Sequence, residues 1–275
     1  MLIGHEKHIA TLEAMRKQDA MAHAFLVTGP SGVGKSEFAL VASRWLQGGG
    51  EFASYSNATS SASNPDIIQM RSPSIKEIRQ LRATVAQAPY SASTRAVILT
   101  DAHELGDEAA NALLKTLEEP RSRTVFFLLA HNASRVLPTI ASRCYHIPLG
   151  LVKDSQNLPE DVAVLVRGRP QRSLEFSQNA VLADQARDAV RDARKFLAGT
   201  LSERFTLIDQ YSQEDAPFSL FFEALIEVTR GELGVRKGNT SLRALLDISR
   251  RLQTGNASSV WMLRSFALQT LSSKV

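Results

Sequence analysis

The spacing of hydrophobic positions changes along the chain and separates roughly the first 150 residues from the remainder. In the first part, short apolar runs alternate with helical patterns, which is typical of a parallel sheet with crossover helices. The runs predict strands at Ala24–Thr28, Ile67–Met70, Ala96–Thr100, Val125–Ala130 and Tyr145–Pro148. We therefore expect an α/β fold with helices on both faces of a parallel sheet.

Apolar spacing and capping residues predict the helices between these strands. The predicted helices cover Lys35–Leu46, Ser74–Gln87, Asp107–Glu119 and Ser134–Ala141. Ser74 and Glu77 form a capping box at the start of the second helix, and Pro120 ends the third. Gly48–Asn64 has no apolar periodicity and is rich in Gly, Ser, Ala and Asn, so we expect a mobile surface loop there.

Helical patterns dominate from Asp161 onward, after the strand signal fades beyond Gly150. Gly and Pro residues divide this region into short segments. The pattern predicts three parts: an α/β domain over residues 1–150, a small helical lid over 151–178, and a bundle of four or five helices over 179–275.

Composition narrows the class of protein. With 44% hydrophobic and 22% charged residues in 275, the chain is long enough for two or three globular cores. The net charge of +4 is mild, and neither half is a basic nucleic-acid tail. There is no signal-peptide pattern and no apolar run near about 18 residues, so we expect a cytoplasmic protein without a membrane partner. Cys144 is the single cysteine, which excludes an intramolecular disulfide and favours a packing role.

A phosphate-binding loop is the clearest local motif. The sequence fits G-x-x-x-x-G-K-[ST] between a buried strand and an amphipathic helix, over Gly29, Pro30, Ser31, Gly32, Val33, Gly34, Lys35 and Ser36. Glycines let backbone N–H groups converge on phosphate oxygens, and the helix N-terminus adds its positive end. We expect ATP or ADP here, with Lys35 at the β/γ-phosphates and Ser36 on Mg²⁺. The alternative is a fortuitous glycine turn.

Three segments in this order carry a family resemblance: the phosphate loop, Asn111–Pro120 and Ser142–Arg143–Cys144. Together they closely resemble the clamp-loader branch of the AAA+ ATPases, and within it the delta-prime family of bacterial DNA polymerase III, over roughly residues 1–175. The resemblance implies an AAA+ P-loop domain, a helical lid and a C-terminal collar domain. It also implies gamma/tau motor subunits and a delta subunit as partners, in an assembly that contains the sliding clamp and primer–template DNA.

Two departures from the family pattern concern metals and hydrolysis. The family commonly places a four-cysteine zinc module where this chain has Gly48–Asn64, so no structural zinc is expected. A hydrolysing P-loop enzyme of this kind needs an Asp for Mg²⁺ and an adjacent Glu to orient water. The family pattern places these roles on Thr100 and Asp101. A second alignment takes Asp101 as the magnesium aspartate and leaves Ala102 at the base position. Both alignments predict slow or absent hydrolysis.

The predicted lid region also departs from the pattern of hydrolysing relatives. Here hydrolysing relatives place a second nucleotide-sensing arginine, whereas this chain has Gln171, with Arg172 one residue later. This substitution favours weak or structural nucleotide binding.

Arg143 resembles the arginine that one clamp-loader subunit offers to the nucleotide of its neighbour, a role suited to a planar, permanently charged group. The alternative is an arginine paired with a local carboxylate. Lys76, Arg79 and Arg82 recur at three-residue intervals on the helix that begins after Ser74, and similar helices in clamp loaders face DNA. A solvated helix face is the alternative for them.

These observations favour a non-hydrolysing or weakly hydrolysing clamp-loader subunit. It would cap a ring of ATPase subunits, present Arg143 in trans and help to load a sliding clamp on primed DNA. One alternative is an ATP-hydrolysing motor subunit that resembles gamma/tau, and a second is a P-loop kinase whose Arg143 binds its own substrate phosphate.

Overall fold

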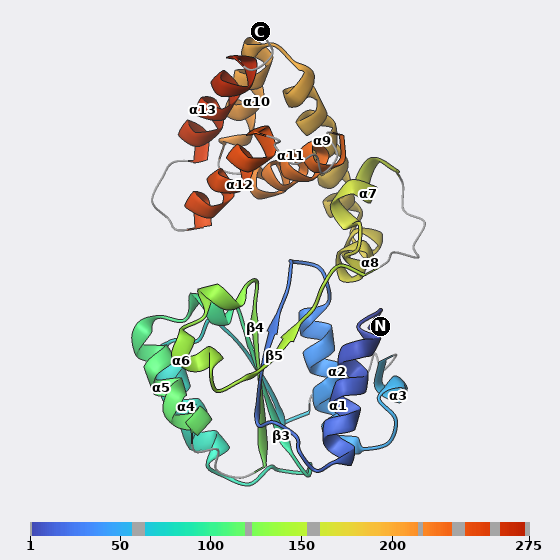
Figure 1. The fold of residues 1–275 in the computed structure, drawn as a ribbon, viewed down its shortest axis with the longest axis vertical. Coiled ribbons are helices and arrows are strands. Elements are labelled where there is room, and N and C mark those ends of the chain that lie inside the picture. The colour runs from blue at the N-terminus through green and yellow to red at the C-terminus, as the bar shows by residue number, and fades with distance from the viewer. Residues whose placement is uncertain are drawn as a thin grey trace. The chain divides into compact units, whose positions relative to one another are not determined.

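A computed structural model describes residues 2–56, 64–118, 123–152, 160–213, 217–232, 240–253 and 259–272. The chain divides into two compact units (Figure 1). The first contains Met1–Asp154 and Gly168–Arg172, and the second contains Ser155–Arg167 and Ser173–Val275. The region expected to form a separate lid, residues 151–178, is thus shared between the two units.

A five-stranded parallel sheet forms the centre of the first unit, in the order β2-β3-β4-β1-β5 (Figure 1). Its strands are β1 (Ala24–Thr28), β2 (Ile67–Arg71), β3 (Arg95–Thr100), β4 (Thr124–Ala130) and β5 (Tyr145–Pro148). Each strand begins and ends within one residue of its predicted position. Because all pairings are parallel, the carboxyl ends of the strands share one edge of the sheet.

Helices cover both faces of this sheet (Figure 1). Those of the first unit are α1 (Glu6–Lys17), α2 (Lys35–Gly48), α3 (Ala53–Ser56), α4 (Ile75–Val85), α5 (Asp107–Glu118) and α6 (Pro138–Ala141), with 3₁₀ turns η1 (Ala102–Glu104) and η2 (Ala133–Arg135). Alternate β1 side chains enter different cores: Phe25 and Val27 pack with α1 and α2, while Ala24 and Leu26 pack with α4 and α5. The predicted α/β fold is confirmed, and so is the capping box of Ser74 and Glu77 at the start of α4.

The single helix predicted over Ser134–Ala141 is wrong. The structure has the turn η2, then extended backbone at Val136, and then α6. Pro138 explains the break, because a proline lacks the N–H that a continuing helix requires and disfavours helical backbone in the residue before it. Proline is well suited to the first position of a helix, where α6 places it.

The mobile loop predicted over Gly48–Asn64 is wrong for its described part, and residues 57–63 lie outside the described residues. Phe52 is fully buried, with its ring centroid 5.5 Å from that of Trp45 and 6.3 Å from that of Phe38. The Tyr55 hydroxyl donates to the Gly49 carbonyl at 3.0 Å. Phe52 and Tyr55 therefore fix the described part of this segment on the core.

All the regular elements described in the second unit are helices. Its helices are α7 (Glu160–Val166), the main part of α8 (Pro170–Gln178), α9 (Ala180–Ala198), α10 (Leu201–Tyr211), α11 (Phe218–Glu232), α12 (Thr240–Gln253) and α13 (Ser259–Ser272). Buried alanines on α9 line the core that α9 shares with α11. Beyond residue 179 the described chain contains five helices, within the predicted four or five.

Candidate nucleotide site

The phosphate loop joins the end of β1 to the start of α2 and depends on glycine for its path. Gly29, Gly32 and Gly34 have φ angles of 153°, 77° and 94°, which L-amino acids with side chains rarely adopt. A Cβ atom at Gly29 would lie 2.2 Å from the carbonyl oxygen of Leu149. The loop therefore has the curved backbone that the motif predicts, closely packed by its neighbours.

Lys35 lies against this loop. Its Nζ donates to the carbonyl oxygens of Gly29 and Pro30, each at 2.8 Å. Burial lowers the pKa of Lys35 to about 8, and the nearby Asp101 carboxylate partly opposes that shift. The ammonium group and Asp101 are thus electrostatic neighbours at the carboxyl edge of the sheet.

The two acidic-pair positions have different surroundings. Thr100 ends β3, and its Oγ1 donates to the Met70 carbonyl of β2 at 3.3 Å. Asp101 follows in a left-handed conformation, with φ 54°, and its Oδ2 accepts from Nε of Arg71 at 2.9 Å. Ala102 is buried. Asp101, the acid that both alignments share, is an electrostatic neighbour of Lys35, and neither Thr100 nor Ala102 adds a second carboxylate beside it.

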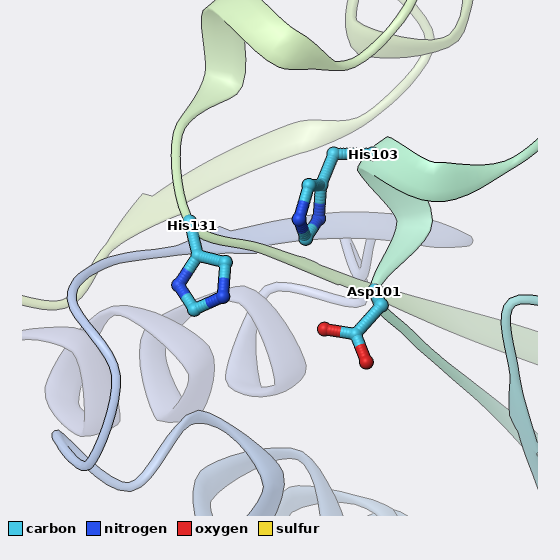
Figure 2. A group of neighbouring side chains, drawn as sticks. All are labelled: Asp101, His103 and His131. Atoms are coloured by element: carbon cyan, nitrogen blue, oxygen red, sulfur yellow. The ribbon is translucent and has the colours of Figure 1, made fainter. Parts of the chain in front are cut away.

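Two histidines beside Asp101 were missed in the sequence. His103 lies in η1 and His131 directly follows β4, and the ligand atoms of Asp101, His103 and His131 all lie within 4.8 Å of one another (Figure 2). The imidazole centroids are 5.0 Å apart and the rings are inclined at 74°. The available signal was that Asp101 and His131 each directly follow a strongly apolar strand.

The chain around Gln171 also contacts the loop. The backbone N–H groups of Gln171 and Arg172 donate to the carbonyl oxygen of Gly32, at 3.2 and 3.4 Å. A Cβ atom at Gly32 would lie 2.8 Å from the Cβ of Arg172. Gln171 and Arg172, in the first turn of α8, therefore contact the phosphate loop directly.

Arg143 lies beyond the end of α6 on the exposed surface of the first unit. Its Nη2 donates to Oε1 of Glu118 at 2.5 Å, and its Nη1 donates to the Thr139 carbonyl at 2.8 Å. Arg143 therefore has a local carboxylate partner, as the alternative interpretation of this residue predicted. Glu118 was not identified from the sequence, because it is 25 residues away along the chain.

Cys144 is half-buried against the core that α4 and α5 share. Burial raises the pKa of its thiol to about 11. A thiol in this environment has little nucleophilic thiolate at neutral pH, which agrees with a packing role.

The predicted DNA-contacting side chains, Lys76, Arg79 and Arg82, are all exposed on α4. Arg79 and Arg82 line a pocket of about 310 Å³ together with Lys115 and Thr116 of α5. Lys76 is not among its lining residues. The structure thus places two of the three predicted residues in one pocket with a further cation, Lys115.

Among the described residues, no helix combines the length and apolar character needed to cross a membrane.

Comparison with known proteins identifies the family. Residues 4–152 match the family model described as DNA polymerase III, delta subunit, which is more than half of the chain. The delta' subunit of DNA polymerase III from Pseudomonas aeruginosa is 35% identical over 137 residues, which cover 45% of this chain and 42% of that protein. The tau subunit from Bacillus subtilis is 29% identical over 212 residues, covering 73% of this chain and 37% of that protein.

A solved structure gives the same fold. The DNA polymerase III gamma subunit-related protein of Thermotoga maritima superposes with a TM-score of 0.57 at 18% identity, covering 94% of this chain and 98% of that one. The chain spans less than half the length of the tau and delta' relatives named above. The match over residues 4–152 confirms the predicted kinship, and the chain belongs to the DNA polymerase III delta-subunit family of clamp-loader proteins.

Proposed function

We propose that this chain is a non-hydrolysing or weakly hydrolysing clamp-loader subunit that acts by its position in a hetero-oligomer. In this proposal, it presents Arg143 to the nucleotide of a neighbouring gamma/tau-type motor subunit and helps to load a sliding clamp onto primed DNA. Membership of the family supports the general role. The finer role rests on the chemistry around the phosphate loop and on the surface position of Arg143.

The single carboxylate at the loop carries the proposal of weak hydrolysis. Thr100 and Ala102 flank Asp101, so the strand end supplies one acid where hydrolysing relatives use two adjacent ones. Thr100 directs its hydroxyl to the Met70 carbonyl, and Ala102 has no group that could orient water. A water molecule attacking a bound phosphate would therefore lack a positioned base from this pair.

Binding of ATP or ADP does not require that base. The loop supplies curved backbone, the first turn of α2 and the Lys35 ammonium, which together suit a polyphosphate. If Mg²⁺ accompanies the nucleotide, the Ser36 hydroxyl and Asp101 carboxylate are the oxygen ligands that this chain offers. The ion would neutralise charge on the phosphate oxygens.

Arg143 is suited to act on another chain. It lies on the exposed surface, and its charge is permanent. The Thr139 carbonyl holds Nη1, while Nη2 is held by the exposed Glu118 carboxylate, a partner that can be exchanged for phosphate.

An ATP-hydrolysing motor subunit is the competing function. The intact phosphate loop and the likeness to Bacillus subtilis tau over 73% of this chain favour it. Measuring ATP turnover by the purified chain, alone and mixed with a gamma/tau protein, separates the two functions. We expect turnover by the isolated chain far below about 1 s⁻¹, the lower end of ordinary enzymatic rates. A turnover near that value would establish the motor function instead.

A further inference from the structure

Three potential metal ligands meet where two neighbouring strands end. The strands β3 and β4 are parallel and adjacent, with Leu99 opposite Leu128. Asp101 directly follows β3, His103 lies in the 3₁₀ turn after it, and His131 directly follows β4. The shared carboxyl edge therefore brings side chains separated by about 30 residues into one group (Figure 2).

The spacing of the three groups is close to that of a metal site. One ligand atom from each residue lies within 4.8 Å of the other two. A tetrahedral zinc site with bonds of about 2.0–2.1 Å has ligand atoms about 3.4 Å apart. The ligand atoms need to approach one another by at most about 1.4 Å to reach that spacing, and Figure 2 shows all three side chains projecting into the same space.

His103 has a nitrogen that none of the described residues satisfies. Its Nδ1 is buried and has no hydrogen-bond partner within the part of the chain that the structure describes. Buried polar groups nearly always have a partner, and a neutral imidazole nitrogen can use its lone pair for a metal ion. His103 is one of the three residues in the cluster. Its unpaired nitrogen therefore supports a metal site independently of the distances between the ligand atoms.

The existing partner of Asp101 does not block a cation. Arg71 contacts only Oδ2, and its side chain is 81% exposed, so the pair is a weak surface ion pair. The ammonium of Lys35 lies near Asp101 and repels a cation. We therefore expect moderate, micromolar affinity in place of the much tighter binding of structural zinc sites.

We propose that Asp101, His103 and His131 bind a divalent transition-metal ion, such as Zn²⁺, beside the phosphate loop. Two imidazoles with one carboxylate favour Zn²⁺, Co²⁺ or Ni²⁺ over Mg²⁺, which prefers oxygen ligands. Three protein ligands also leave a fourth position for water or for an oxygen of a bound phosphate. This site is separate from the Cys₄ type of zinc module and does not depend on the role proposed for Arg143.

Isothermal titration of the 275-residue chain with Zn²⁺, without nucleotide, tests the proposal. We expect one ion per chain with micromolar affinity, retained in a large excess of Mg²⁺. His131→Ala and Asp101→Asn should each weaken binding at least tenfold, and circular dichroism should show unchanged folding, since both side chains lie at the ends of strands and not in a core. His103→Gln should weaken binding similarly.

His8→Ala is the matched control. His8 lies near His5 and His146, so this variant reveals any zinc that binds at that other group of histidines. The control should leave the affinity unchanged. Co²⁺ provides a second readout, since His131→Ala should remove the visible absorption of a four-coordinate Co²⁺ complex. The proposal is overturned if the wild-type chain binds no Zn²⁺, or if His131→Ala and Asp101→Asn bind it as tightly as the wild type.

Discussion

Nη2 of Arg143 lies 2.5 Å from Oε1 of Glu118 in an ion pair on the surface of the first unit. The two side chains are 36% and 46% exposed. Exposed pairs of this kind typically contribute about 0–1 kcal/mol to stability, so the guanidinium can exchange Glu118 for another anion at small cost in free energy. The pair orients Arg143 without committing it to a structural role.

Replacement of Arg143 by Ala in a reconstituted complex tests the proposed action of Arg143 on the nucleotide of a neighbouring subunit. Loss of a dominant arginine finger lowers phosphoryl-transfer rates by about 10³- to 10⁵-fold at the affected site. In a ring with several sites, only the site that faces this subunit should fail, so total DNA- and clamp-stimulated hydrolysis should fall by that site's share. Clamp loading should fall further if the sites act together. Both rates are measured in mixtures with unmodified motor subunits.

Two variants serve as controls for Arg143→Ala. Arg135→Ala removes another exposed arginine, eight residues earlier in η2, and should leave both rates unchanged. Glu118→Gln removes the local partner and keeps the guanidinium, so it should also retain hydrolysis. If Glu118→Gln and Arg143→Ala have the same effect, Arg143 is a structural ion-pair residue.

Lys35→Ala should weaken binding of ATP and ADP without unfolding the chain. The substitution removes a cation and two hydrogen bonds to the loop carbonyls, while the glycine backbone proposed to surround the phosphates remains. Titration with a fluorescent ATP analogue measures the affinity, and Lys17→Ala, at the exposed end of α1, controls for loss of charge. Equal affinities for the wild type and Lys35→Ala would place the nucleotide elsewhere.

Asp66 should make the first unit sensitive to acid. Burial raises the pKa of Asp66, but hydrogen bonds from the backbone N–H groups of Ser91, Tyr90 and Ala92, together with the charge of Arg95, outweigh it and hold the pKa below 3.8. Because the folded pKa is lowered, this stabilisation is present above about pH 4. It is lost as the pH falls through the folded value.

The test uses urea unfolding in a Trp261→Phe background, where Trp45 alone reports on the first unit. Asp66→Ala should lower the free energy of unfolding at pH 7 by about 3–5 kcal/mol, because it leaves the buried Arg95 without its carboxylate. Glu118→Gln breaks an exposed pair in the same unit and should change it by less than about 1 kcal/mol. The difference between wild type and Asp66→Ala should shrink below pH 4. A constant difference down to pH 3 would contradict the assigned ionisation.

Cys144 should react slowly with alkylating reagents in the folded chain. Its pKa of about 11 is about two units above the ordinary value of 9.0, so the thiolate fraction at pH 8 is roughly 100-fold lower than in the unfolded chain. Labelling with iodoacetamide is specific because the chain has one cysteine. The rate should rise with pH up to about 11, and equal rates with and without urea at pH 8 would contradict the shift.

The fold was predictable where the signal is local. A strand such as β4 is buried along its whole length, and its apolar run therefore marks its limits to within one residue. The capping box at Ser74 was equally local. The errors arose where one side chain changes the local outcome: Pro138 divides a helix, and Phe52 fixes a polar segment on the core.

The candidate site was predictable only as separate segments. The phosphate loop is contiguous in sequence, so its backbone path followed from its glycines. The meeting of Asp101, His103 and His131 depends on β3 and β4 being adjacent, and apolar periodicity does not reveal strand order. Arg143 and Glu118 likewise belong to different elements, so their ion pair became evident only from the fold.

The place of β1 within the sheet has a consequence for the growing chain on the ribosome. Ala24 pairs with Phe126 and Phe25 pairs with Tyr145, so β1 stays without either neighbour while about 100 more residues are made. At about 5–20 residues per second, that interval lasts roughly 5–20 s. Throughout it, an apolar strand with two open edges is available for pairing with other nascent chains. We therefore expect the half-made polypeptide to depend on chaperones until its fourth strand emerges.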